Sequence, residues 1–200
     1  MRTIKTLALF LSIAAGLFAA PYQVTVDTST LSGDYQVYFN LNGVTGNVAT
    51  ISGFNLGGGT ALFPVVVGPG DLNSSVTLNI NPPNPPFAEF AQNFTVGSQL
   101  SFTLDLTNNG PAAGNSPDAF GFALATTGNV NLPTTDPSGA DYLFFVELTG
   151  APLNFEVFTV LGTGITPTIT AVTIPEPSFG LLSAGLLMGM MGIRRFRLSA

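Results

Sequence analysis

The chain of 200 residues contains no cysteine, no histidine and no tryptophan. Without cysteine it can form no disulfide, no thiol nucleophile and no thiolate metal site. Without histidine it has no Ser-His-Asp triad, no imidazole base and no histidine-ligated metal. Because most of the usual catalytic groups are missing, we expect that the protein is not an enzyme and holds no resident cofactor.

Positive charge is almost as scarce. The five basic residues are Arg2, Lys5, Arg194, Arg195 and Arg197, so no Lys, Arg or His lies between positions 6 and 193. That interval therefore lacks the cationic footprint for nucleic acid, and it offers no Schiff-base lysine or phosphate clamp. The ten acidic residues before position 175 give this body a formal charge of −10: Asp27, Asp34, Asp71, Glu89, Asp105, Asp118, Asp136, Asp141, Glu147 and Glu156.

The N-terminus has the pattern of a secretory signal peptide over residues 1–19. Arg2 and Lys5 form the charged region, and residues 7–18 form a short apolar run. Ala19 and Ala20 supply small residues for cleavage, which we place at the bond between them because Pro21 disfavours cutting directly before it. The apolar run is too short to span a membrane. We therefore predict export, with signal peptidase as a processing partner.

The C-terminus combines three features over residues 174–200. Residues 179–193 form an apolar run, which we predict to be a short transmembrane helix, and the basic tail of residues 194–200 follows it. Positive charge stays on the cytoplasmic side, so Arg194, Arg195 and Arg197 place the acidic body outside. Pro175, Glu176 and Pro177 precede the helix in an extended, accessible segment, because proline fixes φ and donates no N–H.

This order of tripeptide, hydrophobic segment and arginine cluster resembles the PEP-CTERM sorting signal of exported proteins in Gram-negative bacteria that make extracellular polysaccharide. The resemblance implies an exosortase as partner, cleavage near Pro175-Glu176-Pro177, a precursor anchored in the inner membrane, and delivery to the cell surface or extracellular matrix. Whether the tail is removed or retained stays open.

Between the ends, residues 20–173 alternate apolar and polar positions with the period of a half-buried strand. The clearest runs are 100–107, 35–41, 76–80 and 120–124. Further strands are expected at 22–28, 48–56, 62–67, 87–96, 141–149, 154–160 and 168–174, while 86–93 is the one alternative helix. Glycine and proline turns separate these runs. About ten such strands predict an all-β fold, an antiparallel β-sandwich of jelly-roll type.

Much of this body also resembles an uncharacterised family of exported PEP-CTERM proteins. The matching stretches include VATISGFNLGGGT at 48–60, QNFTVGSQLSFTLDL at 92–106 and PTTDPSGADY at 133–142. The resemblance implies secretion and a β-rich domain, and it transfers no catalytic residue.

Three kinds of ligand site remain open for the body. Calcium prefers carboxylate and carbonyl oxygens, and its weak candidates are Asp71, Asp118, Asp136 and Asp141, for which Asx turns are the alternative. A carbohydrate-binding face needs exposed aromatic rings. The tyrosines are Tyr22, Tyr35, Tyr38 and Tyr142, and Tyr38 should point outward because Val37 and Phe39 point inward. A glycoside hydrolase would need a carboxylate pair drawn from Glu89, Glu147 and Glu156.

The sequence thus favours a structural or adhesive component of a surface or biofilm that contains exopolysaccharide. A calcium-dependent or carbohydrate-binding module is the alternative, and a carboxylate-type hydrolase is the third reading.

Overall fold

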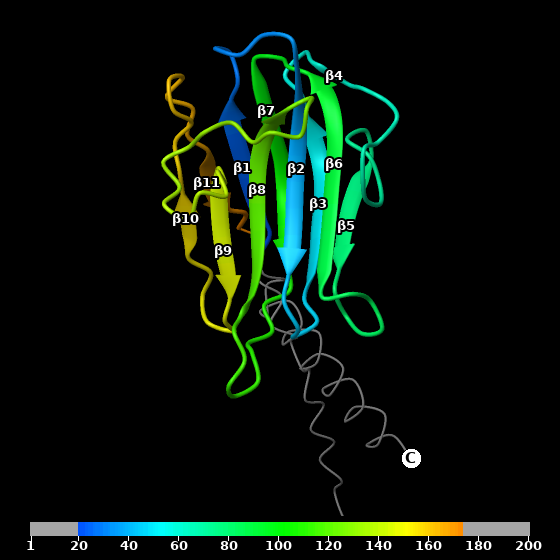
Figure 1. Ribbon diagram of the computed structural model, residues 1–200, viewed down its shortest axis with the longest axis vertical. Helices are drawn as coiled ribbons and strands as arrows, with labels where there is room; N and C mark the ends of the chain where they lie inside the picture. Colours follow the sequence, from blue (N-terminus) through cyan, green and yellow to red (C-terminus); the bar gives the residue numbers. More distant parts are fainter. Residues whose placement is uncertain (1–19, 174–200) are drawn as a thin grey trace, which may run out of the picture.

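A computed structural model describes residues 20–173, which form two antiparallel sheets packed face to face as a β-sandwich (Figure 1). The strands are β1 (Tyr22–Asp27), β2 (Asp34–Asn42), β3 (Val48–Asn55), β4 (Thr60–Ala61), β5 (Ser75–Asn79), β6 (Phe87–Thr95), β7 (Gln99–Leu106), β8 (Asp118–Thr126), β9 (Phe144–Leu148), β10 (Phe155–Val157) and β11 (Thr168–Ala171). The five-stranded sheet has the order β11-β1-β7-β3-β5, and the six-stranded sheet has the order β10-β9-β8-β2-β6-β4. The predicted all-β class is confirmed.

The core lies between the sheets and is rich in phenylalanine. Phe39 of β2 lies 5.2 Å, centroid to centroid, from Phe102 of β7 in an edge-to-face contact that joins the two layers. Phe122 of β8 meets the same Phe102 ring at 5.2 Å. All three side chains are fully buried. Burial of these rings, together with the aliphatic side chains around them, holds the sheets together.

The two described ends of the domain lie side by side. Tyr22 of β1 is paired with Ala171 of β11, and the backbone N–H of Val172 donates to the carbonyl oxygen of Pro21 at 2.7 Å. β11 is therefore an edge strand that closes on the start of the domain.

The predicted strand at 62–67 is wrong. Pro64 has no N–H to donate to a ladder, and Phe63 points outward with 62 % of its surface exposed. The segment contacts β6 irregularly: the N–H of Leu62 donates to the carbonyl of Asn93, the Gln92 side chain donates to the carbonyl of Leu62, and residues 66–67 bond to Ala91. It is a loop that runs along the sheet edge.

The alternative helix at 86–93 is also wrong, because β6 occupies this segment. Its residues pair with β2 at every position from Phe87 to Thr95. Phe90 and Phe94 are fully buried on the core side, and this tertiary pairing overrides any local helical preference.

Other predicted strands are shorter than expected. β9 begins at Phe144 rather than at residue 141, since Asp141 adopts a left-handed φ of 57° that a strand does not allow. β8 differs in a second way, because its outward positions are buried as well as its inward ones. The alternation at 120–124 puts Gly121 and Ala123 on the outward face, where both are buried, and Tyr142 lies over Gly121.

Residues 20–173 contain no helix of the length and apolarity that a membrane span requires. The predicted signal peptide, sorting motif, transmembrane helix and basic tail lie outside these residues.

Candidate functional site

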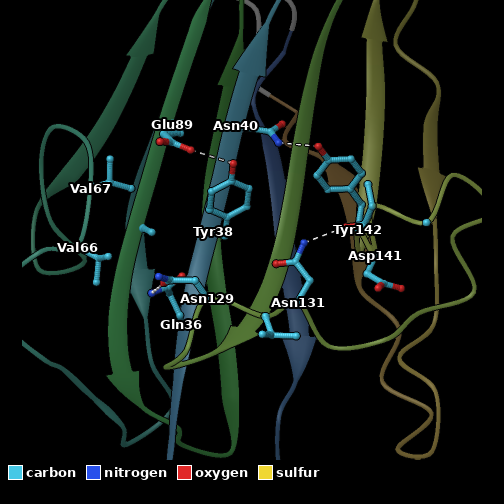
Figure 2. A pocket seen from close by; sticks show the side chains of 14 residues that line it. Gln36, Tyr38, Asn40, Val66, Val67, Glu89, Asn129, Asn131, Asp141 and Tyr142 are labelled. Carbon is cyan, nitrogen blue, oxygen red and sulfur yellow. Dashed lines mark hydrogen bonds between the residues drawn. The ribbon is translucent and has the colours of Figure 1, made fainter.

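A groove of about 750 Å³ lies on the outer face of the six-stranded sheet (Figure 2). β2 and β6 form its base. The loop at 66–67 flanks it on one side, and the connection from β8 to β9 flanks it on the other. Its lining residues are Gln36, Tyr38, Asn40, Val66, Val67, Glu89, Ala91, Asn129, Val130, Asn131, Gly139, Ala140, Asp141 and Tyr142. The volume is typical of a ligand site, although the lining is unusually polar.

Strand alternation places the groove residues of β2. Val37, Phe39 and Leu41 face the core and are fully buried, so Gln36, Tyr38 and Asn40 must face the opposite side. The predicted outward direction of Tyr38 is confirmed, and its ring lies half-buried in the groove.

Tyr142 reaches the groove from the far side of β8. Its ring crosses above Gly121, where an added Cβ would lie 2.5 Å from Tyr142 Cε1, and packs on Phe145 with the centroids 5.9 Å apart. Its hydroxyl oxygen accepts a hydrogen bond of 2.6 Å from Asn40 Nδ2. The missing side chain of Gly121 is thus what lets this ring bridge from the β8–β9 connection to β2.

One end of the groove is rich in acceptors. Tyr38 Oη donates to Glu89 Oε2 at 3.0 Å, and Asn40 lies directly opposite Glu89 in the ladder. Burial, reinforced by the nearby Glu89 carboxylate, raises the pKa of Tyr38 to about 12, although a hydrogen bond with Asn40 opposes this rise. Tyr38 therefore remains a neutral phenol, and its hydroxyl group continues to donate a hydrogen bond to Glu89.

The other end is lined by amides. Gln36, which is 2 % exposed, donates from Nε2 to Asn129 Oδ1 at 2.8 Å and to Asn93 Oδ1 at 3.1 Å. Asn131 Nδ2 donates to the carbonyl oxygen of Ala140 at 2.8 Å. Figure 2 shows Glu89, Tyr38, Asn40 and Tyr142 toward one end and Gln36 with Asn129 toward the other. These bonds hold the amides in fixed orientations.

The four calcium candidates lie in turns and strand ends. Asp71 accepts from the N–H of Asn73, and Asp136 accepts from the N–H of Ser138, which are Asx turns. Asp141 Oδ1 accepts from the N–H of Thr134 at 2.8 Å and lines the groove. Within residues 20–173, no three acidic side chains lie close enough to one another to hold a metal ion.

Asp118 is the most enclosed of the four. It is fully buried at the start of β8 and accepts hydrogen bonds from the N–H groups of Val44, Thr45 and Asn47 and from the Asn47 amide. Burial alone would raise its pKa, but the bonds from Thr45 and Asn47 outweigh that effect and lower the pKa below its ordinary value. Its carboxylate therefore fastens the β2–β3 turn to β8.

Asp136 shows the same balance. Burial would raise its pKa, and hydrogen bonds from Ser138 and from the backbone of Tyr142 and Asp141 lower it overall. These bonds fix the turn that leads into Tyr142, so Asp136 helps to position one side of the groove.

The three candidate carboxylates for hydrolysis are on different strands. Glu89 of β6 lines the groove, whereas Glu147 of β9 and Glu156 of β10 are exposed and lie outside it. β2 and β8 separate β6 from β9, which puts Glu89 roughly 14 Å from Glu147 at the usual strand spacing. That separation exceeds the range of a hydrolytic pair between these two groups. Glu147 and Glu156 lie on the paired strands β9 and β10, and both are exposed outside the groove.

Two of the four tyrosines lie outside the groove. Tyr22 packs against Phe155 with the ring centroids 4.7 Å apart, and Tyr35 packs against the core.

The amide side chains of the groove were not predicted as site residues: Gln36, Asn40, Asn129 and Asn131. For Gln36 and Asn40 a signal existed, since both share the period-2 face of Tyr38.

The predicted processing residues fall almost wholly outside the described residues. Ala20 is the first described residue and is exposed. The other predicted processing residues lie outside residues 20–173: Ala19, Pro175, Glu176, Pro177, Arg194, Arg195 and Arg197.

No protein-family model matches the chain, and no curated protein and no solved structure is significantly similar to it.

Proposed function

We propose that the protein is an exported component of the cell surface or extracellular matrix that binds polysaccharide in the groove. The observation that carries the proposal is the convergence of two partly exposed tyrosines with four amides in one groove of about 750 Å³. This proposal combines two readings of the sequence: a structural or adhesive surface component, and a carbohydrate-binding module.

The chemistry of the lining suits a sugar chain. A sugar ring presents hydroxyl groups at its edges and apolar C–H groups on its faces. Amide side chains both donate and accept hydrogen bonds, so they match hydroxyl groups, and their orientation here is already fixed. Tyr38 and Tyr142 offer apolar ring faces together with a hydroxyl group. Val66 and Val130 add exposed apolar surface at the two sides.

Binding is tested by affinity electrophoresis of the purified protein in gels that contain one soluble polysaccharide each. Retardation in at least one gel is expected for the wild type. Tyr38→Ala and Tyr142→Ala are expected to weaken retention about tenfold, which corresponds to roughly 1.4 kcal/mol for each lost ring contact.

The matched control is Phe87→Ala, since Phe87 is an aromatic residue of β6 that is 45 % exposed and does not line the groove. Its retention should equal that of the wild type. Equal loss in all three variants, or no retention of the wild type by any polysaccharide, would contradict the proposal.

We propose in addition that export and sorting follow the two terminal signals. Signal peptidase would cut between Ala19 and Ala20, the helix at 179–193 would hold the precursor in the inner membrane, and an exosortase would act at Pro175-Glu176-Pro177. What supports this is the order of these features in the sequence.

Deletion of residues 175–200 is the direct test of sorting. Loss of surface retention and of C-terminal processing is expected, with mass spectrometry of the mature C-terminus as the measurement. Unchanged secretion, processing and retention in the deletion variant would contradict the sorting proposal without touching the binding proposal.

We propose the jelly-roll type for the sandwich. The pairs β1–β7, β2–β6 and β3–β5 are nested in sequence, and they alternate between the two sheets. This nesting is what a long hairpin produces when it wraps around a core.

A further inference from the structure

The acceptor-rich end of the groove contains a buried oxygen that lacks a partner. Asn40 is 4 % exposed, and within the described residues its Oδ1 atom is buried and accepts no hydrogen bond. Its Nδ2 atom is already committed to Tyr142. A buried acceptor without a donor costs about 1–3 kcal/mol. This oxygen lies against Gly121 of β8 with almost no accessible surface, so a ligand in the groove meets the neighbouring acceptors instead.

Glu89 of β6 is the lateral neighbour of Asn40. Asn40 and Glu89 are opposite each other on β2 and β6, so their side chains lie on the same face about 5 Å apart at Cβ. Tyr38 satisfies Oε2 of Glu89 from one side. Tyr38 Oη and the Glu89 carboxylate thus present two neighbouring acceptors to the groove, while Asn40 Oδ1 points toward β8, away from Glu89 (Figure 2).

No cationic side chain balances this carboxylate. Positions 6–193 contain no Lys, Arg or His, so neither Glu89 nor Asp141, the other acid in the lining, has a basic partner in the domain. A ligand with uronate, sulfate or phosphate groups would be repelled by both. A primary ammonium group has one positive charge and three N–H donors, which matches a carboxylate beside a phenol oxygen whose own proton is already donated.

We infer that the groove selects polysaccharides whose hexosamine units carry free amino groups, with the ammonium recognised by Glu89 and by Tyr38 Oη. This inference rests on the proposed polysaccharide binding. An N-acetylated unit has one N–H and no charge, and a neutral hexose has hydroxyl donors alone, so both satisfy this end of the groove less well.

The test is isothermal titration calorimetry with three hexasaccharides at about pH 5.5, where primary amines are protonated. The probes are the hexamers of glucosamine, of N-acetylglucosamine and of glucose. Wild-type protein is expected to bind the glucosamine hexamer at least about tenfold more tightly than the other two.

Two variants with the same change in charge locate the effect. Glu89→Gln keeps the shape of the side chain and is expected to bring the three hexamers to within about twofold of one another. Glu147→Gln removes an exposed charge from the same sheet outside the groove and should retain the wild-type preference. Circular dichroism confirms that both variants are folded.

The outcomes separate the inference from the proposal beneath it. Equal wild-type affinity for all three hexamers would overturn the inference and leave polysaccharide binding intact. No affinity for these hexamers, together with no retention in any polysaccharide gel, would overturn both. Equal weakening by Glu89→Gln and Glu147→Gln would show general charge attraction and overturn the inference. Tighter binding of a polygalacturonate chain in the presence of calcium would also overturn it.

Discussion

The outer faces of the two sheets differ in what their polar side chains do. On the five-stranded sheet, Thr50, Thr77 and Asp105 are short side chains on an open strand surface. On the six-stranded sheet, Gln36 and Asn40 occupy equivalent outward positions but are almost fully buried. Both faces follow the same alternation along their strands. The difference comes from the segments at 62–67 and 127–142, which border one face and make a groove of it.

The comparison extends to the acids of the two sheets. Asp118 of β8 is buried and accepts hydrogen bonds from the β2–β3 turn, whereas Asp105 of β7 is exposed. We therefore expect that replacing outward or buried polar side chains of the six-stranded sheet lowers the free energy of unfolding. Replacing the outward polar side chains of the five-stranded sheet should change it little.

The largest effect is expected for Asp118→Asn. The new NH₂ group would face the N–H and the side-chain amide of Asn47, donor against donor, and the charge that strengthens these bonds would be lost. The free energy of unfolding should fall by about 3 kcal/mol, measured by urea titration. Asp105→Asn is the matched control and should change it by less than about 0.5 kcal/mol. A similar loss of unfolding free energy in both variants would contradict the proposed difference between the sheets.

The same pair predicts a dependence on pH. The folded pKa of Asp118 is below its ordinary value of 3.8, so its ionised form stabilises the native state above that value. This contribution is lost as pH falls through the folded pKa. The stability gap between the wild type and Asp118→Asn should therefore be constant near neutral pH and narrow below about pH 4. A gap that stays constant down to the acid transition would contradict this account.

A smaller effect is expected for Gly121→Ala, which places a methyl group against Tyr142 and the side-chain oxygen of Asn40. Displacing the ring should cost about 2 kcal/mol in thermal unfolding and weaken retention by polysaccharide about tenfold, as Tyr142→Ala does. Gly128→Ala is the control, because a Cβ there comes no nearer than 3.7 Å to Thr126 Oγ1. If Gly121→Ala keeps wild-type binding, Tyr142 does not have to bridge to β2.

The smallest effect is expected for Tyr142→Phe. It removes the hydroxyl that accepts from Asn40 and leaves the ring over Gly121. The loss should be about 1 kcal/mol, because the amide donor is then left without its partner. Thermal melts against Tyr142→Ala would separate the hydrogen bond from the ring, and an equal loss in both variants would assign the whole effect to the hydroxyl.

The sequence carried the direction of side chains better than the paths of loops. Val37, Tyr38 and Phe39 form an alternation that a strand must obey, so the outward position of Tyr38 could be predicted from three letters. The same rule could have placed Gln36 and Asn40 beside it. Strand 62–67 failed for a local reason that was visible in the sequence, namely Pro64.

The other half of the groove could not be predicted in this way. Tyr142 follows a turn whose course depends on hydrogen bonds to Asp136, and its contact with Asn40 joins positions 102 residues apart. Period-2 patterning says nothing about which loop covers which strand. The role of Gly121 was hidden for the same reason, since its small size matters only once the ring of Tyr142 lies above it.

The closure of β11 on β1 has a mechanical consequence. A load applied to the chain at Thr173 acts along β11, whose residues Thr168–Ala171 are held by the ladder to Tyr22–Thr25. When the load acts along the axis of the strand, its hydrogen bonds share the force in shear instead of opening one at a time. If the six-stranded sheet binds a polymer, tension between that polymer and Thr173 acts on an edge strand that resists sliding. The first step of forced unfolding would then be the release of the four-residue strand β11.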